Sequence, residues 1–280
     1  MRLFPQLESG LEVYLVFSRD AEFKDWRTGI DEAGRGCLAG PVVVASVTWR
    51  QSWAEQQTWF SEVKDSKMMT ATQRARICTA LLRSVRVRVS VVHPLLVDLM
   101  NVTQASLHGF ELVAPPSRED HAVIVDGHLK PVTLAYAHAV VKGDRHVSCV
   151  AAASIVAKNY RDQLMVQAPF QDYGFAVHKG YGTARHLETL QQLGPCPFHR
   201  KSFEPVRKVT RPSAELESSL WWALSASLTQ GELQDIWMKF LSEYHLVDLS
   251  FAHRITARFQ SMGLKILPTP DAFKPEWGRH

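Results

Sequence analysis

The spacing of apolar and polar residues along the chain changes between the periods typical of strands and of helices. The segment Val85 to Val91 alternates with period two, as a half-buried strand does. Thr70 to Leu82 and Pro94 to Leu112 have helical spacing. A further helix is expected through Ala151 to Leu164, and Ser148 is a candidate cap for it.

Short apolar runs predict the remaining strands. Pro41 to Val47 would form a hairpin with the stretch around Asp31. Another strand ends at Asp126, and a third lies near Lys142. An additional strand is expected at Val13 to Phe17. Because strands come first and helices are interleaved later, the pattern predicts an α/β fold in which helices flank a mixed β-sheet.

The residues after Pro205 have a helical pattern. Three helices are expected, at residues 214–228, 230–244 and 249–262. Thr229 and Glu232 have the spacing of a capping box at the start of the second helix, and Gly263 would end the third.

The second of these helices has an apolar stripe formed by Leu233, Ile236, Trp237, Phe240 and Leu241. Gln230 with Leu233, Ile236 and Trp237 also matches the loose outline of a sliding-clamp-binding peptide. We favour a packed helical face, because the stripe alone explains the apolar spacing. A contact with a sliding clamp is the weaker alternative.

Four carboxylates occupy unusual positions. Asp31 and Glu32 are adjacent within a predicted strand, where charged residues are depleted and neighbouring carboxylates repel. Asp126 and Asp144 each follow an apolar run. Ends of successive strands lie on one edge of a sheet, where open α/β folds place their sites. The four carboxylates could therefore converge on a hard divalent cation, although a single Asp beside Gly is more often a turn or helix cap.

The adjacency of Asp31 and Glu32 raises a geometric difficulty. In a regular strand the two side chains point to opposite faces. Either the backbone is irregular there, or one of the pair acts partly through its carbonyl or a water.

Composition agrees with a single globular core and a small appendage. The chain has 280 residues, of which 46% are hydrophobic and 21% charged, with a net charge of +4. Residues 142–208 hold ten Lys and Arg against five Asp and Glu, whereas residues 209–280 hold seven against eight. A positive face beside a carboxylate site suits a polyanion, although an ordinary solvated surface gives the same count.

Cysteine spacing and hydropathy limit the remaining classes. Cys37, Cys78, Cys149 and Cys196 show no C-x-x-C pair, so a zinc site and a disulfide framework are not expected. The apolar stretch from Leu11 to Phe17 is too short to span a bilayer and lacks the features of a signal peptide. We expect a cytoplasmic protein with no membrane association.

Seven segments together carry a family resemblance. They are Gly-Ile-Asp-Glu-Ala-Gly-Arg-Gly at 29–36, Lys-Asp-Ser-Lys at 64–67, Val-Asp-Gly at 125–127, Val-Lys-Gly-Asp at 141–144, Ala-Ala-Ala-Ser-Ile-Val-Ala-Lys at 151–158, His-Lys-Gly-Tyr-Gly-Thr at 178–183 and His-Arg-Lys-Ser-Phe at 199–203. With these motifs the chain resembles ribonuclease HII, a branch of the ribonuclease H-like nucleases. The ordered set spans residues 28 to 207.

The resemblance implies a catalytic metal site made of Asp31, Glu32, Asp126 and Asp144. Two Mg²⁺ or Mn²⁺ ions would be held there, with Asp31 as the candidate bridging ligand. The implied substrates are RNA/DNA hybrids and duplex DNA that contains ribonucleotides. The implied cut lies 5′ of the ribonucleotide and leaves a 5′-phosphate and a 3′-hydroxyl.

The resemblance also implies substrate contacts. The backbone of Gly34-Arg35-Gly36 would read the 2′-hydroxyl, and Tyr181 would pack against the neighbouring sugar. The other candidate contacts are Lys64, Ser66, Lys67, Lys142, Ser154, Lys158, Arg161, Lys179 and Arg200. Each of the cations could equally be a surface charge or a local ion pair, and each serine a cap or a core group. His199 is assigned no catalytic role.

Three parts are expected: a lead-in at 1–26, a ribonuclease HII-like catalytic domain at 27–208 and a helical extension at 209–280, in a monomer. The closest rival is ribonuclease HIII, which usually carries an N-terminal platform domain for which 26 residues are too few. A catalytically silent hybrid-binding module would lack one or more of the acidic ligands, and all four are present.

Overall fold

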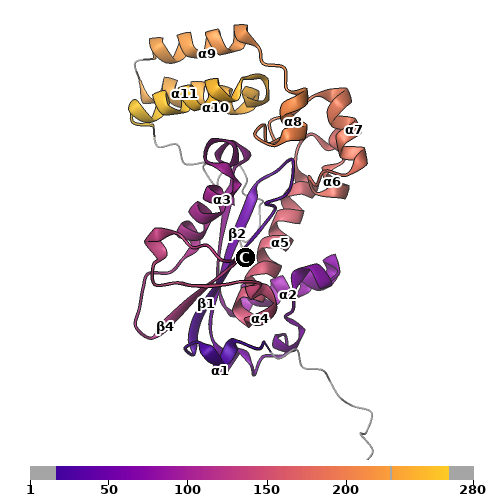
Figure 1. Cartoon of the computed structure of the whole chain (residues 1–280), viewed down its shortest axis with the longest axis vertical. Coiled ribbons are helices and arrows are strands. Elements are labelled where there is room, and N and C mark those ends of the chain that lie inside the picture. The colour runs from indigo at the N-terminus through magenta and orange to yellow at the C-terminus, as the bar shows by residue number, and fades with distance from the viewer. Residues whose placement is uncertain (1–16, 228, 265–280) are drawn as a thin grey trace, which may run out of the picture.

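A mixed five-stranded sheet forms the centre of the protein (Figure 1). The structure, a computed structural model, describes residues 17–227 and 229–264. The strands are β1 (Trp26–Ala33), β2 (Val42–Arg50), β3 (Arg86–Val92), β4 (His121–Asp126) and β5 (His138–Val140), in the order β3-β2-β1-β4-β5. The β1–β2 and β2–β3 pairs are antiparallel, and β1–β4 and β4–β5 are parallel. The predicted mixed sheet is confirmed.

Helices cover both faces of this sheet. Helix α5 (Ser148–Gln167) packs on one face with α2 (Ala71–Ser84), and α3 (Pro94–Val113) packs on the other. The remaining α-helices of this part are α1 (Gln51–Ala54), α4 (Gly143–His146), α6 (Phe175–His178), α7 (Ala184–Leu193) and α8 (Glu204–Val209). Single 3₁₀ turns occur at Asp20–Glu22, Phe60–Glu62, Ser66–Met68, Val132–Leu134, Gln171–Tyr173 and Tyr244–Leu246.

Helix α5 lies directly against the backbone of β1. A β-carbon at Gly29 would lie 2.1 Å from the carbonyl carbon of Cys149, so only glycine permits this approach. The expected cap of α5 was wrong: Ser148 is the first helical residue, and its hydroxyl donates to Oε1 of Gln51. Its amide instead donates to the carboxylate of Asp20, 3.1 Å away, so the acceptor comes from a residue 128 positions earlier in the chain.

Helix α3 is interrupted at Asn101, which has a positive φ of 66°. The Asn101 side chain accepts hydrogen bonds from the amides of Thr103 and Gln104, both at 3.0 Å, and so caps the second half of the helix. The helix expected over this range therefore has the predicted extent but consists of two segments.

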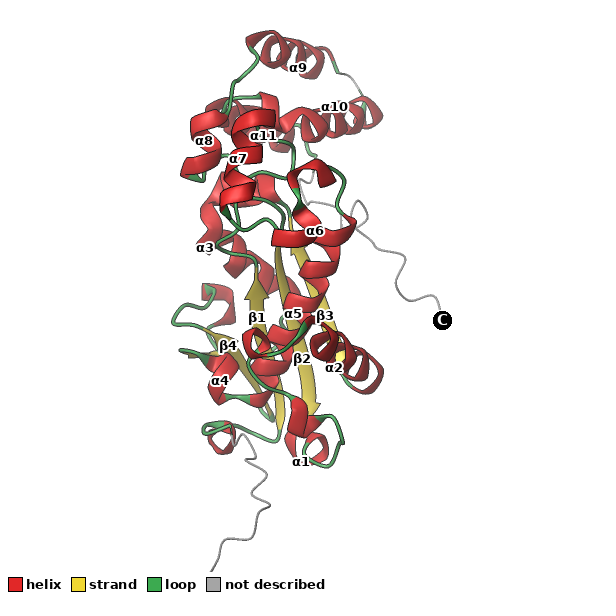
Figure 2. Cartoon of the chain, turned by 90° about the vertical axis from the view of Figure 1, so that its right-hand side faces the viewer, coloured by secondary structure: helices red, strands yellow, loops and turns green. Residues whose placement is uncertain are grey.

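Three further helices stack at one end of the sheet (Figure 2). They are α9 (Ala214–Ala226), α10 (Gln230–Glu243) and α11 (Leu249–Ser261). The capping box of Thr229 and Glu232 is present, and Gly263 follows α11 with a φ of 82°. Leu233 and Trp237 are buried in a core shared by these helices and Leu95 of α3, which supports the packed-face interpretation of the stripe.

One expected strand falls at the edge of the described region. Residues 13–16 of the expected N-terminal strand lie outside the described residues, and Phe17 is buried without forming a strand. Within the described part of the chain, each helix is too short or too polar to cross a membrane.

Candidate active site

Three aspartates lie at the edge of the sheet where β1 and β4 run in parallel. In the register of this pair Ile30 is opposite Val125, so Asp31 and Asp126 follow at neighbouring positions. Asp144 is in the short helix α4, and the amide of the adjacent Gly143 donates to Oδ1 of Asp126 at 2.6 Å. The side chains of Asp31 and Asp144 are both buried. Asp31, Asp126 and Asp144 therefore occupy neighbouring positions at this edge of the sheet.

The side chain of Glu32 lies on the face of the sheet opposite to that of Asp31. The β1–β2 register is continuous through Asp31, opposite Ala45, and Glu32, opposite Val44, so the backbone is regular here. Oε1 of Glu32 accepts a hydrogen bond from Arg35, while Oε2 is buried without a hydrogen-bond partner among the described residues.

The carboxyl groups raise one another's pKa values. Burial raises the pKa of Asp31 well above its ordinary value, and the charges of Glu32 and Asp126 raise it further, against a hydrogen bond from Ser154. Burial also raises the pKa of Glu32, which Arg35 lowers and Asp126 raises. Burial and the charge of Asp144 raise the pKa of Asp126. Negative charge at this edge is therefore incompletely compensated.

The donor set fits a hard divalent cation, although the side chains are not arranged around one. Within the described ranges, no three Asp, Glu, His or Cys side chains form a group that could hold an ion. Nζ of Lys67 lies 3.1 Å from Oδ2 of Asp144, and Asp126 accepts the Gly143 amide. The all-carboxylate set and the free Oε2 of Glu32 still match the oxygen ligands that Mg²⁺ and Mn²⁺ prefer. Lys67 occupies one oxygen of Asp144 and leaves the other to an ion.

Two buried guanidinium groups hold the glycine turn after β1. Arg161 donates to the carbonyls of Ala39, Pro41 and Lys179, and Arg200 donates to those of Arg35 and Gly40. Both arginines have no exposed surface, so they support the backbone and do not face solvent as phosphate contacts would.

The turn itself is closed on one side and open on the other. Gly34 has a φ of 97°, and a β-carbon there would lie 2.0 Å from Nε of Arg161. A β-carbon at Gly36 would meet no other atom within 4 Å. The backbone around Gly36 is therefore accessible to a ligand. Arg35 spans this turn and also donates to the hydroxyl of Thr103 in α3, a residue that the sequence patterns did not single out.

Tyr181 is joined to the same turn through its loop. The amides of Leu38 and Ala39 donate to the carbonyl of Gly180. The ring of Tyr181 is 43% exposed, and Nζ of Lys158 lies 5.3 Å from its centroid. The aromatic ring is thus presented to solvent beside the glycine turn.

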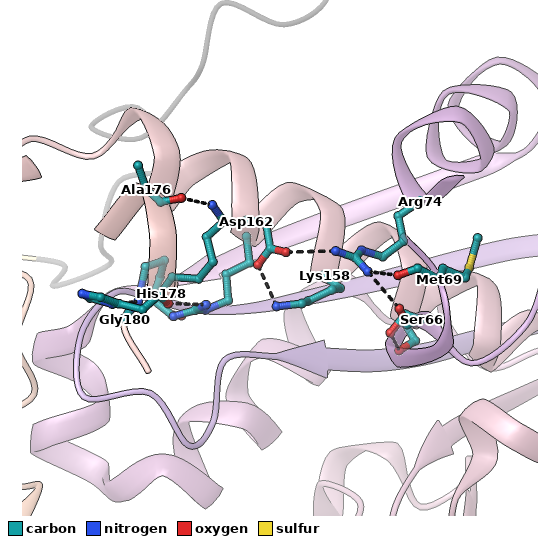
Figure 3. Close-up of polar contacts among 12 residues, drawn as sticks. Ser66, Met69, Arg74, Lys158, Asp162, Ala176, His178 and Gly180 are labelled. Atoms are coloured by element: carbon teal, nitrogen blue, oxygen red, sulfur yellow. Dashed lines mark hydrogen bonds and ion pairs between the residues drawn. The ribbon is translucent and has the colours of Figure 1, made fainter. Parts of the chain in front are cut away.

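The other candidate contacts differ in their surroundings. Asp162 lies between Lys158, at 2.7 Å, and Arg74, at 3.4 Å (Figure 3). The ammonium of Lys179 donates to the carbonyl of Ala176. Lys67 and Lys142 are exposed and Lys64 is half-buried.

Two serines of separate motifs meet beside Asp31. The hydroxyls of Ser66 and Ser154 are 2.9 Å apart, and Ser154 bonds Asp31. Asp65 accepts a hydrogen bond from Arg145, the neighbour of Asp144, which ties the segment of Ser66 to α4. His199 has a partner that the sequence patterns did not indicate: its Nε2 lies 3.0 Å from Nε2 of His186.

The family model for ribonuclease HII matches residues 28–206, a range that contains all four carboxylates. The chain belongs to the ribonuclease HII family. It is therefore a ribonuclease H, an endoribonuclease of the hydrolase class. Curated members include a ribonuclease HII of Oleidesulfovibrio alaskensis, 37% identical over 231 residues that cover 72% of this chain and 88% of the relative. One from Chloroflexus aurantiacus is 44% identical over 183 residues, which cover 64% and 86%.

Solved structures agree with this fold. The crystal structure of the ribonuclease H2 from Pyrococcus horikoshii OT3 matches with a TM-score of 0.53 and 27% identity, over 66% of this chain and 96% of that one. The structure of Bst-RNase HIII in complex with Mn²⁺ has the same fold, with a TM-score of 0.50 and 21% identity over 66% and 68% of the two chains.

Proposed function

We propose that this ribonuclease H hydrolyses the RNA strand of RNA/DNA hybrids and incises duplex DNA on the 5′ side of an embedded ribonucleotide, leaving a 5′-phosphate and a 3′-hydroxyl. The observation that carries the proposal is the position of the open glycine turn. It lies one residue past β1, which bears Asp31 and Glu32, and beside the exposed ring of Tyr181. A ribose at Gly36 would therefore be close to the carboxylate edge.

Each part of the site has a separate task in this proposal. Asp31, Glu32, Asp126 and Asp144 would hold two Mg²⁺ or Mn²⁺ ions, which when bound supply an activated water and stabilise charge on the phosphate. The backbone of Gly34-Arg35-Gly36 would contact the 2′-hydroxyl, which is both donor and acceptor and distinguishes RNA from DNA. Tyr181 would pack on the adjacent sugar and fix the scissile phosphate in place.

Arg161 and Arg200 would act on the turn and not on the substrate. Their guanidinium groups donate hydrogen bonds to carbonyl oxygens on both sides of the turn. The amides of residues 34–36 would therefore keep one orientation before substrate binds. Lys67, which lies beside Asp144, would contact a phosphate of the substrate, as would Lys142 and Lys64. We propose residues 27–208 as the catalytic domain, because every residue assigned a task lies within it.

Labelled duplexes that carry no ribonucleotide, one or many would test the function, each with Mg²⁺, Mn²⁺ or EDTA. We expect metal-dependent cleavage of the second and third duplexes, with a ligatable 5′-phosphate. Cleavage of the pure DNA duplex at a similar rate would refute recognition of the 2′-hydroxyl. Undiminished cleavage in EDTA would refute the metal assignment.

A further inference from the structure

A cavity of about 650 Å³ lies at the end of the sheet remote from Asp31. It begins at Trp26, the first residue of β1, which is five positions before Asp31. At about 3.3 Å per residue the two are roughly 17 Å apart along the strand. The candidate active-site residues are absent from its lining.

The floor of the cavity is a part of the sheet that α3 leaves uncovered. Helix α3 covers this face as far as Val113, and the cavity lies beyond that residue. Across the strands, Thr48 is opposite both Thr28 and Arg86, and Ser46 is opposite Arg88. Where a covered sheet face would carry apolar residues, this one carries hydroxyl and guanidinium groups. The Ser46 hydroxyl donates to the carbonyl of Val113, and Thr28 is fully buried. The polar floor residues that line the cavity and face a ligand are therefore Thr48, Arg86 and Arg88.

The charge of the lining is positive and only partly neutralised. Arg50 is paired with Asp25 at 3.3 Å, and Arg118 with Asp120 at 3.2 Å. Arg86 and Arg88 form no ion pair with a carboxylate in the described ranges, although Arg88 donates to the carbonyl of Ala114. Both guanidinium side chains belong to exposed residues. Two cationic groups are thus available to an anion at the edge strand β3.

Two tryptophans border the same cavity. Trp26 is 39% exposed and Trp53 is 38% exposed. The guanidinium of Arg50 lies 5.6 Å from the ring of Trp26, and the ring of His121 lies 6.4 Å away on a tilted plane. An indole that lies beside a guanidinium and has part of its surface in solvent can accept a stacked base.

We propose that this cavity binds a nucleoside phosphate, with the base on Trp26 and the phosphate on Arg86 and Arg88. A volume of about 650 Å³ is in the range of small-molecule sites, which span about 300–1,000 Å³. The hydroxyl of Thr48, which lines the cavity, lies on β2 between the strands that carry the two anchors. The ligand is either a free nucleotide or one unit of a single-stranded nucleic acid. An acidic peptide would use the arginines but has no group that requires the exposed indole.

The test uses the full-length protein in EDTA at fixed salt, with fluorescence anisotropy of a labelled eight-nucleotide single-stranded DNA. Reversing both charges with Arg86→Glu and Arg88→Glu should weaken binding at least about tenfold. Trp26→Ala should weaken it about five- to a hundredfold, and Trp26→Phe less, because an aromatic face remains. All variants should cleave an RNA/DNA hybrid as the unchanged protein does.

Matched controls separate the site from general electrostatics. Arg207→Glu with Lys208→Glu makes the same change of charge on α8, and Trp222→Ala removes an indole that is 77% exposed on α9. Both controls should bind the oligonucleotide within twofold of the unchanged protein. Displacement of the label by millimolar AMP would identify a free nucleotide as the ligand, whereas displacement by unlabelled oligonucleotide alone would identify a strand.

Three results would overturn the proposal. One is unchanged affinity for the oligonucleotide in both the double arginine variant and a Trp26 variant. The Trp26 variant used for this comparison is one whose melting temperature equals that of the unchanged protein. Another is an equal loss of affinity in the α8 control. The third is displacement of the label by a polyglutamate peptide as effectively as by oligonucleotide, which would assign the cavity to an acidic peptide.

Discussion

The hydroxyl of Tyr244 donates a hydrogen bond to the buried carboxylate of Asp98, 146 positions earlier in the chain. The same carboxylate accepts the amides of Lys201 and Ser202, each at 2.8 Å. The ammonium of Lys201 in turn donates to the carbonyls of Tyr244 and Val247. The preceding residue, Arg200, donates to the carbonyl of Arg35 in the glycine turn. Two consecutive residues therefore bind different segments: Arg200 binds the glycine turn, and Lys201 binds the C-terminal helices.

Tyr244→Phe should lower the free energy of unfolding by about 1–3 kcal/mol, because the buried Asp98 carboxylate loses a donor. Urea denaturation measures this change. Tyr160→Phe is the matched control, since the Tyr160 hydroxyl forms no hydrogen bond with any residue in the described ranges, and it should change stability little. Equal effects of the two substitutions would contradict a specific role for the bond between Tyr244 and Asp98.

A truncation that ends at Arg211 should retain metal-dependent cleavage, because the carboxylates, the glycine turn and Tyr181 all precede it. It should melt at a lower temperature than the full chain. The truncation exposes Leu95 and removes Tyr244 and Val247, which are hydrogen-bond partners of Lys201 and Asp98. Calorimetry and cleavage at low temperature measure the two effects. A folded truncation that binds metal but does not cleave would place the C-terminal helices in the substrate site.

Asp31→Asn should abolish cleavage, spare hybrid binding and stabilise the metal-free protein. The folded state raises the pKa of this carboxyl, so between the ordinary value of 3.8 and the raised value it holds a proton that the unfolded chain has lost. Stability of the metal-free protein therefore falls as pH rises through that interval. The substitution should raise the melting temperature at pH 7.5 in EDTA by a few degrees, since about 1 kcal/mol shifts it by about 2–4 °C.

Magnesium provides the internal check on that prediction. It should stabilise the unchanged protein more than Asp31→Asn, because the variant lacks the charge that the ion would neutralise. Asp235→Asn, an exposed change in α10, should alter neither cleavage nor the pH dependence of melting. A metal-free variant no more stable than the unchanged protein would show that repulsion at the site is already relieved.

Tyr181→Ala should slow single-turnover cleavage at an isolated ribonucleotide by more than it weakens binding, because in the proposed function the ring would position the scissile phosphate. Tyr181→Phe keeps the ring and should retain most of the rate. Parallel losses of rate and affinity in both variants would instead assign the phenolic hydroxyl to binding.

Local patterns in the sequence predicted much of the fold and the candidate site. The strand that ends at Asp126 and the capping box of Thr229 and Glu232 depend on neighbouring residues, and both are present. The regular register of β1 leaves Asp31 and Glu32 on opposite faces, so the suggested irregular backbone was wrong. Strand alternation alone had already implied those two directions.

Contacts between distant segments were beyond the reach of the sequence patterns. Ser148 has the residue type of a cap, but Asp20 takes that place from 128 positions away. Arg200 is a residue type that often contacts phosphates, yet its guanidinium donates to backbone carbonyls of the glycine turn. In each case the decisive partner is set by the packing of the sheet and α5, which periodicity does not encode.

The approach of α5 to β1 at Gly29 has a consequence for how the family can diversify. Side-chain packing usually sets the spacing between a helix and a sheet, so changes of core volume move the two apart or together. Here backbone meets backbone at Cys149, and no side chain lies between them. Ser154, five residues further along α5, inherits its distance to Asp31 from that contact. Descendants of this sequence can therefore exchange much of their hydrophobic interior while the edge that carries Asp31 keeps its geometry, provided that position 29 stays glycine.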